Sequence, residues 1–154
     1  MPDLSTAPLE LPTFEERDEI TRADLVFYGV DHSGPSYTAH VFLERPNATL
    51  TTPRTTEEGY VGSLTVFGHG GCYGDEGHCL PRSRYTDEFD RRPGHPLEPL
   101  TETLIATDAL RPLLLDPTRL EASVDLVVEA PGRRSPASES PLRFELVRLL
   151  VYVA

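Results

Sequence analysis

Hydrophobic and polar residues alternate along several short segments of the chain, with the period of two that is typical of β-strands with one buried face. The clearest alternation, in residues 36–44, sets Tyr37, Ala39, Val41 and Leu43 against Thr38, His40, Phe42 and Glu44. Five other short runs are rich in apolar and β-branched residues and end at turn-forming residues: 23–30, 60–67, 100–106, 122–130 and 142–153. The pattern predicts an all-β fold, an antiparallel β-sandwich.

Two connections between these runs are typical of hairpin turns. Residues 31–35 (Asp-His-Ser-Gly-Pro) separate the first two strands, and residues 131–141, rich in Pro, Ser and Arg, separate the last two. We therefore expect each of these strand pairs to be adjacent in one sheet. A single short helix is expected to have Thr107 or Asp108 as its N-cap, with Pro112 in its first turns, where a missing N–H is tolerated.

Three segments fall outside the strand pattern. Residues 1–22 carry three prolines and an acidic cluster, which predicts an extended N-terminal arm before a sandwich domain spanning 23–154. Residues 45–58 are polar, Thr-rich and twice interrupted by proline, as in a long loop or a poor edge strand. Residues 67–79 hold both cysteines, two of the five histidines and five glycines. This Gly/Cys/His loop continues into an irregular tract, and loops of such length commonly carry function.

Charge and composition exclude several function classes. The 154-residue chain has a net charge of −11, and its 14 basic residues are all arginines, scattered or paired along the sequence. Such a chain repels phosphate backbones, so nucleic acid is not an expected partner, and without lysine it has no Schiff-base nucleophile. The start lacks the basic and apolar regions of a signal peptide, and no run reaches the roughly 18 apolar residues of a membrane span. We expect a cytoplasmic protein without membrane association.

The order and spacing of the strand-like runs resemble the C-terminal domain of plant-type polyphenol oxidases and related tyrosinases, which are type 3 copper proteins. The matching pieces are residues 25–30, 37–43, 60–69, 104–110, 122–128 and the terminal run, which together cover most of residues 23–153. Each piece is short and mostly hydrophobic, so the likeness lies in their order. The resemblance implies a jelly-roll-like sandwich that lies over the dicopper site of a catalytic domain and shields it.

The chain departs from this family in two respects. It lacks the catalytic domain, and its five histidines are fewer than the six imidazoles of a type 3 dicopper centre. The segment after Phe67 is also richer in metal ligands than that region of the plant domains. By analogy with cysteine-bearing fungal tyrosinase domains and the separate copper-delivering partners of some bacterial tyrosinases, we interpret the chain as a non-catalytic accessory protein, or copper chaperone, that binds a type 3 copper oxidase catalytic subunit.

Two interpretations of the loop remain open. His69, Cys72, His78 and Cys79 offer the imidazole and thiolate ligands that Zn²⁺ and Cu⁺ prefer, although their spacing matches no standard zinc finger. Alternatively, Cys72 and Cys79 form a disulfide worth about 2–3 kcal/mol by the chain-entropy model. The corresponding alternative functions are a small metalloprotein or metalloenzyme with zinc or copper in this loop, and a structural β-domain with a disulfide.

Three further residues are interpreted individually. Phe67 and Tyr73 are the candidate partner contacts, because an aromatic side chain at a loop tip can insert into a partner's cavity. His40 is interpreted as an ordinary strand residue. We assign no catalytic residue.

Overall fold

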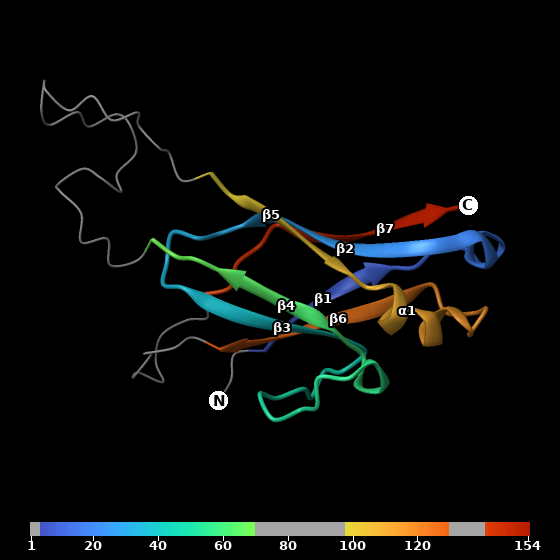
Figure 1. Ribbon diagram of the computed structural model, residues 1–154, viewed down its shortest axis with the longest axis horizontal. Coiled ribbons are helices and arrows are strands. Elements are labelled where there is room, and N and C mark those ends of the chain that lie inside the picture. The colour runs from blue at the N-terminus through green and yellow to red at the C-terminus, as the bar shows by residue number, and fades with distance from the viewer. Residues whose placement is uncertain (1–3, 70–97, 130–140) are drawn as a thin grey trace, which may run out of the picture.

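The computed structural model describes residues 4–69, 98–129 and 141–154, which form two antiparallel sheets packed face to face (Figure 1). Sheet A has the strand order β1-β6-β3-β4, and sheet B has the order β5-β2-β7. The strands are β1 (Leu4–Glu10), β2 (Ile20–Val30), β3 (Tyr37–Leu43), β4 (Tyr60–Val66), β5 (Leu100–Ile105), β6 (Glu121–Glu129) and β7 (Leu146–Val153). The helices are α1 (Thr107–Leu114) and the 3-10 helices η1 (Phe14–Glu19) and η2 (Thr56–Glu58). The predicted all-β sandwich with one short α-helix is confirmed.

The core lies between the two sheets and is built by alternate residues of their central strands. Tyr37, Ala39, Val41 and Leu43 of β3 all face it, as their alternation predicts. From sheet B, Leu25 and Phe27 of β2 are fully buried, and the Phe27 ring meets Phe144 edge to face at 5.4 Å. Because burial of one such side chain is worth about 1.5–3 kcal/mol, the central strands supply much of the driving force for folding.

Both predicted hairpins are wrong, because each pair of consecutive strands is divided between the two sheets. β2 pairs with β5 and β7, whereas β3 pairs with β4 and β6. The turn of residues 31–36 therefore crosses from sheet B to sheet A. β6 and β7 are separated in the same way. A turn signal shows only that the chain reverses, and here β2, β3 and β6 already have a partner on each side.

Residues 1–22, expected to form an extended arm, contribute the strand β1 to sheet A. β1 pairs with β6 along its whole length, from Leu4 opposite Val127 to Glu10 opposite Glu121, and Leu9 is buried in the core. η1 then leads into β2, which begins at residue 20, earlier than the alternation indicated.

The short helix is present, but its predicted N-cap is wrong. The N-cap is Ala106, and the helix runs from Thr107 to Leu114 with Pro112 inside it. The Thr107 hydroxyl oxygen instead accepts a hydrogen bond from the backbone N–H of Ala23 at 3.0 Å, so a contact with β2 replaces the local cap. At eight residues α1 is much shorter than the roughly 20 residues of a membrane span, and no helix in the described part of the chain could cross a membrane.

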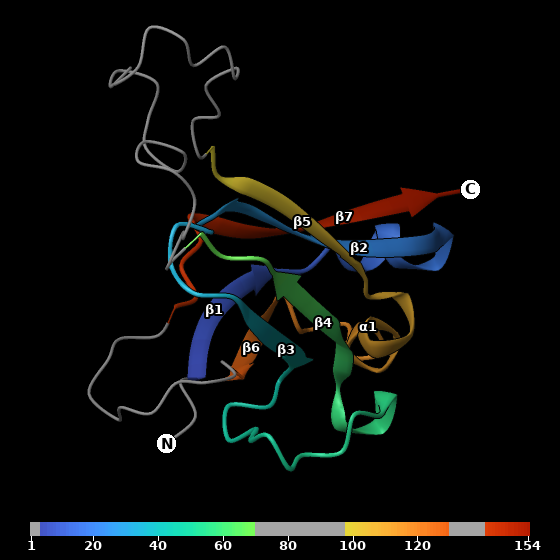
Figure 2. The same ribbon diagram turned by 60° about the vertical axis from the view of Figure 1, so that its left-hand side comes forward.

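The two ends of the sandwich carry different elements, as both views of the ribbon show (Figures 1 and 2). α1 and η1 lie at one end, where β2 begins. β4 runs toward the opposite end, where the turn of residues 31–36 crosses between the sheets and β4 continues into the predicted Gly/Cys/His loop. This second end holds the described part of the predicted site.

Candidate functional site

The first residues of the predicted loop are fastened to the crossing turn between β2 and β3. The Gly68 N–H donates to the Ser36 hydroxyl at 2.9 Å, and the His69 N–H donates to the His32 carbonyl at 2.9 Å. A Cβ on Gly68 would lie 2.0 Å from the Gly34 carbonyl oxygen, so only glycine permits this approach of the two backbones. The glycine at the start of the loop therefore allows close chain packing.

Two imidazoles meet at this end of the sandwich. The rings of His32 and His69 lie edge to face with their centroids 4.9 Å apart. His32 Nε2 is 2.7 Å from the Glu98 carbonyl oxygen, and His69 Nδ1 is 3.3 Å from the His32 carbonyl oxygen. Residues 69 and 98, on either side of the undescribed segment, thus both contact His32. His32 could not be selected from the sequence, because nothing in its local turn indicates a contact with a residue 37 positions away.

Beside this pair, Phe67 is 78% exposed, which is unusual for a large aromatic side chain. Of the residues predicted to bind metal, form a disulfide or contact a partner, only Phe67 and His69 lie in the described ranges. Cys72, Tyr73, His78 and Cys79 fall within residues 70–97, outside the described residues, so the metal site, the disulfide and the Tyr73 contact stay predictions. Elsewhere in residues 4–69, 98–129 and 141–154, no three His, Cys, Asp or Glu side chains group so as to hold a metal ion.

A second polar cluster lies on the outer face of sheet A, around His40. His40 is buried, with Nδ1 2.8 Å from the Ser63 hydroxyl and Nε2 3.0 Å from the Arg54 guanidinium. The Ser63 hydroxyl is also 2.7 Å from the Tyr60 hydroxyl, and Glu129 Oε2 is 3.2 Å from His40 Nε2. His40 Nε2 therefore faces both the Arg54 guanidinium, which is a donor, and the Glu129 carboxylate, which is an acceptor. The cluster fastens the loop that carries Arg54 to the sheet.

The Tyr37 hydroxyl is buried in the core and has no hydrogen-bond partner among the described residues. Burial raises the pKa of Tyr37 to about 12, and the nearby carboxylates of Asp31 and Glu102 act in the same direction. An unpartnered buried hydroxyl destabilises the folded state, because it gives up its bonds to water without replacement.

Replacement of Tyr37 with phenylalanine is therefore expected to raise the free energy of unfolding at neutral pH by about 1 kcal/mol. For the protein with Tyr37, as the pH rises, the tyrosine loses its proton at a lower pH in the unfolded state than in the folded state. Stability present below the ordinary pKa of 10.0 is therefore lost as the pH rises toward about 12, by about 2–3 kcal/mol in total. Tyr37→Phe removes this loss. Urea unfolding at pH 8, 10 and 11 measures both effects.

The matched control for this measurement is Tyr152→Phe, because Tyr152 is about half exposed. It should leave the alkaline loss unchanged. The chain has no lysine, so no side-chain ammonium group titrates in the same pH range. A Tyr37→Phe protein that keeps the alkaline loss, or that is less stable than the native protein at neutral pH, would contradict the assignment.

Comparison with known proteins supports the fold. No protein-family profile and no curated protein sequence matches the chain. Among solved structures, latent aurone synthase (a polyphenol oxidase) from its natural source is similar with a TM-score of 0.53 and 14% identity, over 99% of this chain and 25% of that chain. The recombinantly expressed latent enzyme is similar with a TM-score of 0.53 and 15% identity, over 97% and 24% of the two chains.

The chain thus has a β-sandwich fold that also occurs within plant polyphenol oxidases, as the order of its strands indicated. It spans about a quarter of the length of those proteins. At this level of identity, the likeness is one of fold.

Proposed function

We propose that this chain is a non-catalytic accessory protein that docks on a type 3 copper oxidase and covers its active site. The observation that carries the proposal is the fold similarity: nearly the whole chain matches a quarter of a polyphenol oxidase described as latent. The other three quarters of that protein have no counterpart in these 154 residues. A sandwich that covers the copper site of a separate catalytic chain would keep that chain latent in the same way.

Phe67 is the proposed anchor of this contact. It stands next to His69 at the end of the sandwich where β4 leaves the sheet, and its ring is largely exposed. Exposed aromatic side chains that fill a partner's pocket are typical interface hot spots, because they bury a large rigid surface at low entropic cost. Tyr73, in the same predicted loop, is proposed as the second contact.

The test measures inhibition of diphenol oxidation by added purified chain. Two copper-loaded catalytic chains serve as probes: latent aurone synthase without the quarter that this chain matches, and a type 3 copper oxidase encoded in the same genome as this chain. The native chain should inhibit at least one of them. Phe67→Asp should weaken inhibition about tenfold or more, as expected for a hot-spot residue.

Leu115→Asp is the matched control, because Leu115 is 81% exposed, as much as Phe67, and follows α1 at the other end of the sandwich. It should inhibit as the native chain does. Absence of inhibition of both probes at saturating concentration would overturn the proposal. Equal weakening by both substitutions would remove Phe67 as the anchor.

Copper delivery is the second candidate function, favoured by the contact between the His32 and His69 imidazoles at the start of the segment that holds Cys72, His78 and Cys79. Imidazole and thiolate are suitable ligands for Cu⁺. In the same assay with a copper-free catalytic chain, delivery predicts that activity rises when this chain is added with Cu⁺, and more than with Cu⁺ alone. Inhibition without such a rise would restrict the function to shielding.

A further inference from the structure

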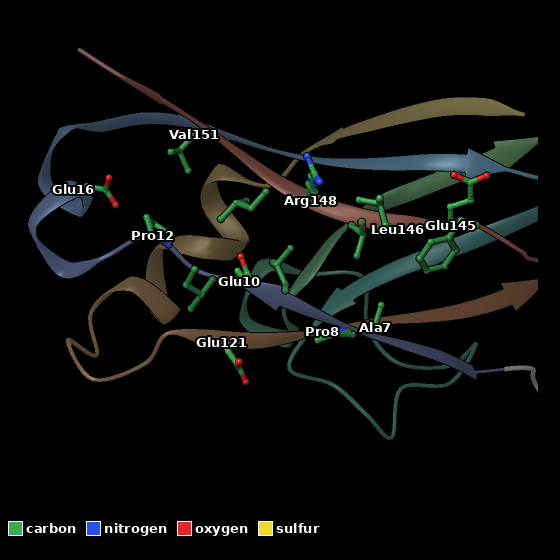
Figure 3. A pocket seen from close by; sticks show the side chains of 15 residues that line it. Ala7, Pro8, Glu10, Pro12, Glu16, Glu121, Glu145, Leu146, Arg148 and Val151 are labelled. Atoms are coloured by element: carbon green, nitrogen blue, oxygen red, sulfur yellow. The ribbon is translucent and has the colours of Figure 1, made fainter.

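A groove of about 950 Å³ runs along one side of the sandwich, between the edges of the two sheets (Figure 3). Its walls are β1, the edge strand of sheet A, and β7, the edge strand of sheet B. β1 pairs with β6 and β7 pairs with β2, and neither has a second strand partner among the described residues. On such an edge, alternate N–H and C=O groups point away from the sheet and can pair with another chain.

The groove has an apolar floor. It is lined by Leu9, Leu11, Phe144, Val147, Leu149 and Val151. The three residues from β7 face the core, yet each stays partly exposed where it lines the groove. The floor can therefore bury further apolar side chains.

The rim of the groove is acidic. Glu10, Glu16, Glu121 and Glu145 line it, against a single basic residue, Arg148. Figure 3 shows Glu16 and Glu145 near opposite ends of the groove, so the negative charge extends along its length. With a net charge of −11 on the whole chain, this rim favours a positively charged occupant.

The two edges differ in their ability to accept a strand. Pro8 lies within β1 and has no N–H, which is how natural proteins commonly block an edge. β7 contains no proline over its eight residues. Its outward-facing Leu146, Leu150 and Tyr152 are also 37–48% exposed, so an added strand would cover apolar surface on that face too. The free edge of β7 is therefore the better site for strand addition.

We propose that this groove binds an extended segment of another protein in which apolar and basic residues alternate, and that the segment pairs with β7 as a fourth strand of sheet B. Its apolar side chains lie over the groove floor, and its long basic side chains reach the carboxylates of the rim. A second copy of this chain fits less well, because it would bring its own negative charge against the rim. The proposal is independent of the proposed function, since Phe67 does not line the groove.

The test uses the full chain and a peptide of about ten residues in which lysine and valine alternate, a length that spans β7. Titration is followed by NMR. We expect shifts of the β7 backbone amides, with increased protection from hydrogen exchange at alternate positions. N-methylation of one set of alternate residues of the peptide should abolish binding, and N-methylation of the other set should not, because a strand offers only one edge to its neighbour.

Charge variants locate the binding site on the protein. Glu10→Gln combined with Glu145→Gln should weaken peptide binding about fivefold to tenfold at low salt. The matched control, Glu57→Gln combined with Asp108→Asn, removes the same charge from exposed positions outside the groove and should change binding less than about twofold.

Three results would overturn the proposal. The first is no binding of the lysine–valine peptide at millimolar concentration. The second is equal binding of a peptide with glutamate in place of lysine, or of both N-methylated forms. The third is a dimer of the chain, detected by sedimentation, with shifts confined to β7, which would assign the edge to a second copy.

Discussion

Replacement of Arg17 with methionine is expected to lower the free energy of unfolding by about 3–4 kcal/mol, close to the largest effects of single substitutions. Arg17 is 7% exposed, and its guanidinium donates hydrogen bonds to four backbone carbonyls. The acceptors are Pro12, Leu114, Asp116 and Arg119. The substitution would leave these carbonyls without their donor.

The position of these acceptors explains the size of the effect. Leu114 is the last residue of α1, and the final carbonyls of a helix have no partner within the helix. A positive charge there also interacts favourably with the helix dipole. Arg17 thus joins η1 to α1 and to the turn after it, two segments about 100 residues apart in the chain.

Urea unfolding measures this effect, with Arg111→Met as the control. Arg111 is exposed on α1, and its contact with Asp108 is 3.7 Å long, so its loss should cost less than about 0.5 kcal/mol. Arg17→Lys should restore only part of the stability, because one ammonium group cannot reach four carbonyls as a planar guanidinium does. An Arg17→Met protein within about 1 kcal/mol of the native stability would show that these bonds are replaced by water.

Replacement of Asp125 with alanine is expected to cost about 3 kcal/mol of unfolding free energy. Asp125 is fully buried on the outer face of β6 and accepts three hydrogen bonds. The donors are the Thr6 hydroxyl at 2.8 Å, the Ser123 hydroxyl at 2.7 Å and the Arg45 backbone N–H at 2.8 Å. One carboxylate therefore joins β1, β6 and the chain that leaves β3.

Asp125→Asn separates the effect of the charge from that of side-chain shape, because it keeps the shape of the side chain and removes its charge. Its amide NH₂ group would face one of the donors that now point at the carboxylate, so we expect a loss of about 1–2 kcal/mol. Asp108→Ala, at an exposed position on α1, should change stability by less than about 0.5 kcal/mol. A fully stable Asp125→Ala protein would mean that the three donors find other acceptors.

Much of the secondary structure could be predicted from the sequence, because strand formation depends on near neighbours. The alternation in residues 36–44 identified both β3 and the side that it turns to the core, and the short helix followed from the residues after 106. The resemblance in strand order also led to the fold found in polyphenol oxidases. The predictions that failed concerned contacts between segments far apart in the chain. Both hairpins were wrong because turn residues do not specify which sheet the next strand joins, and the N-cap was wrong because Thr107 bonds to Ala23.

In the candidate site, too, some residues could be predicted from the sequence and others could not. Phe67 and His69 could be selected from a loop dense in glycine, cysteine and histidine, whereas His32 could not, because only the crossing turn brings it to His69. The acidic groove was also not predicted. Its glutamates come from β1, η1, β6 and the residue before β7, and no local pattern relates them.

The amino-acid sequence by itself determined most of the strands, the core-facing side of β3 and the chemistry of the loop after Phe67, because these depend on residue type and spacing within a few positions. The tertiary structure alone decided which strands became neighbours. It therefore decided that His32 meets His69 and that β1 and β7, within the part of the chain that the structure describes, are edge strands with one strand partner each. These features depend on pairings between segments far apart in the chain, which are selected by the burial of whole sheet faces against each other.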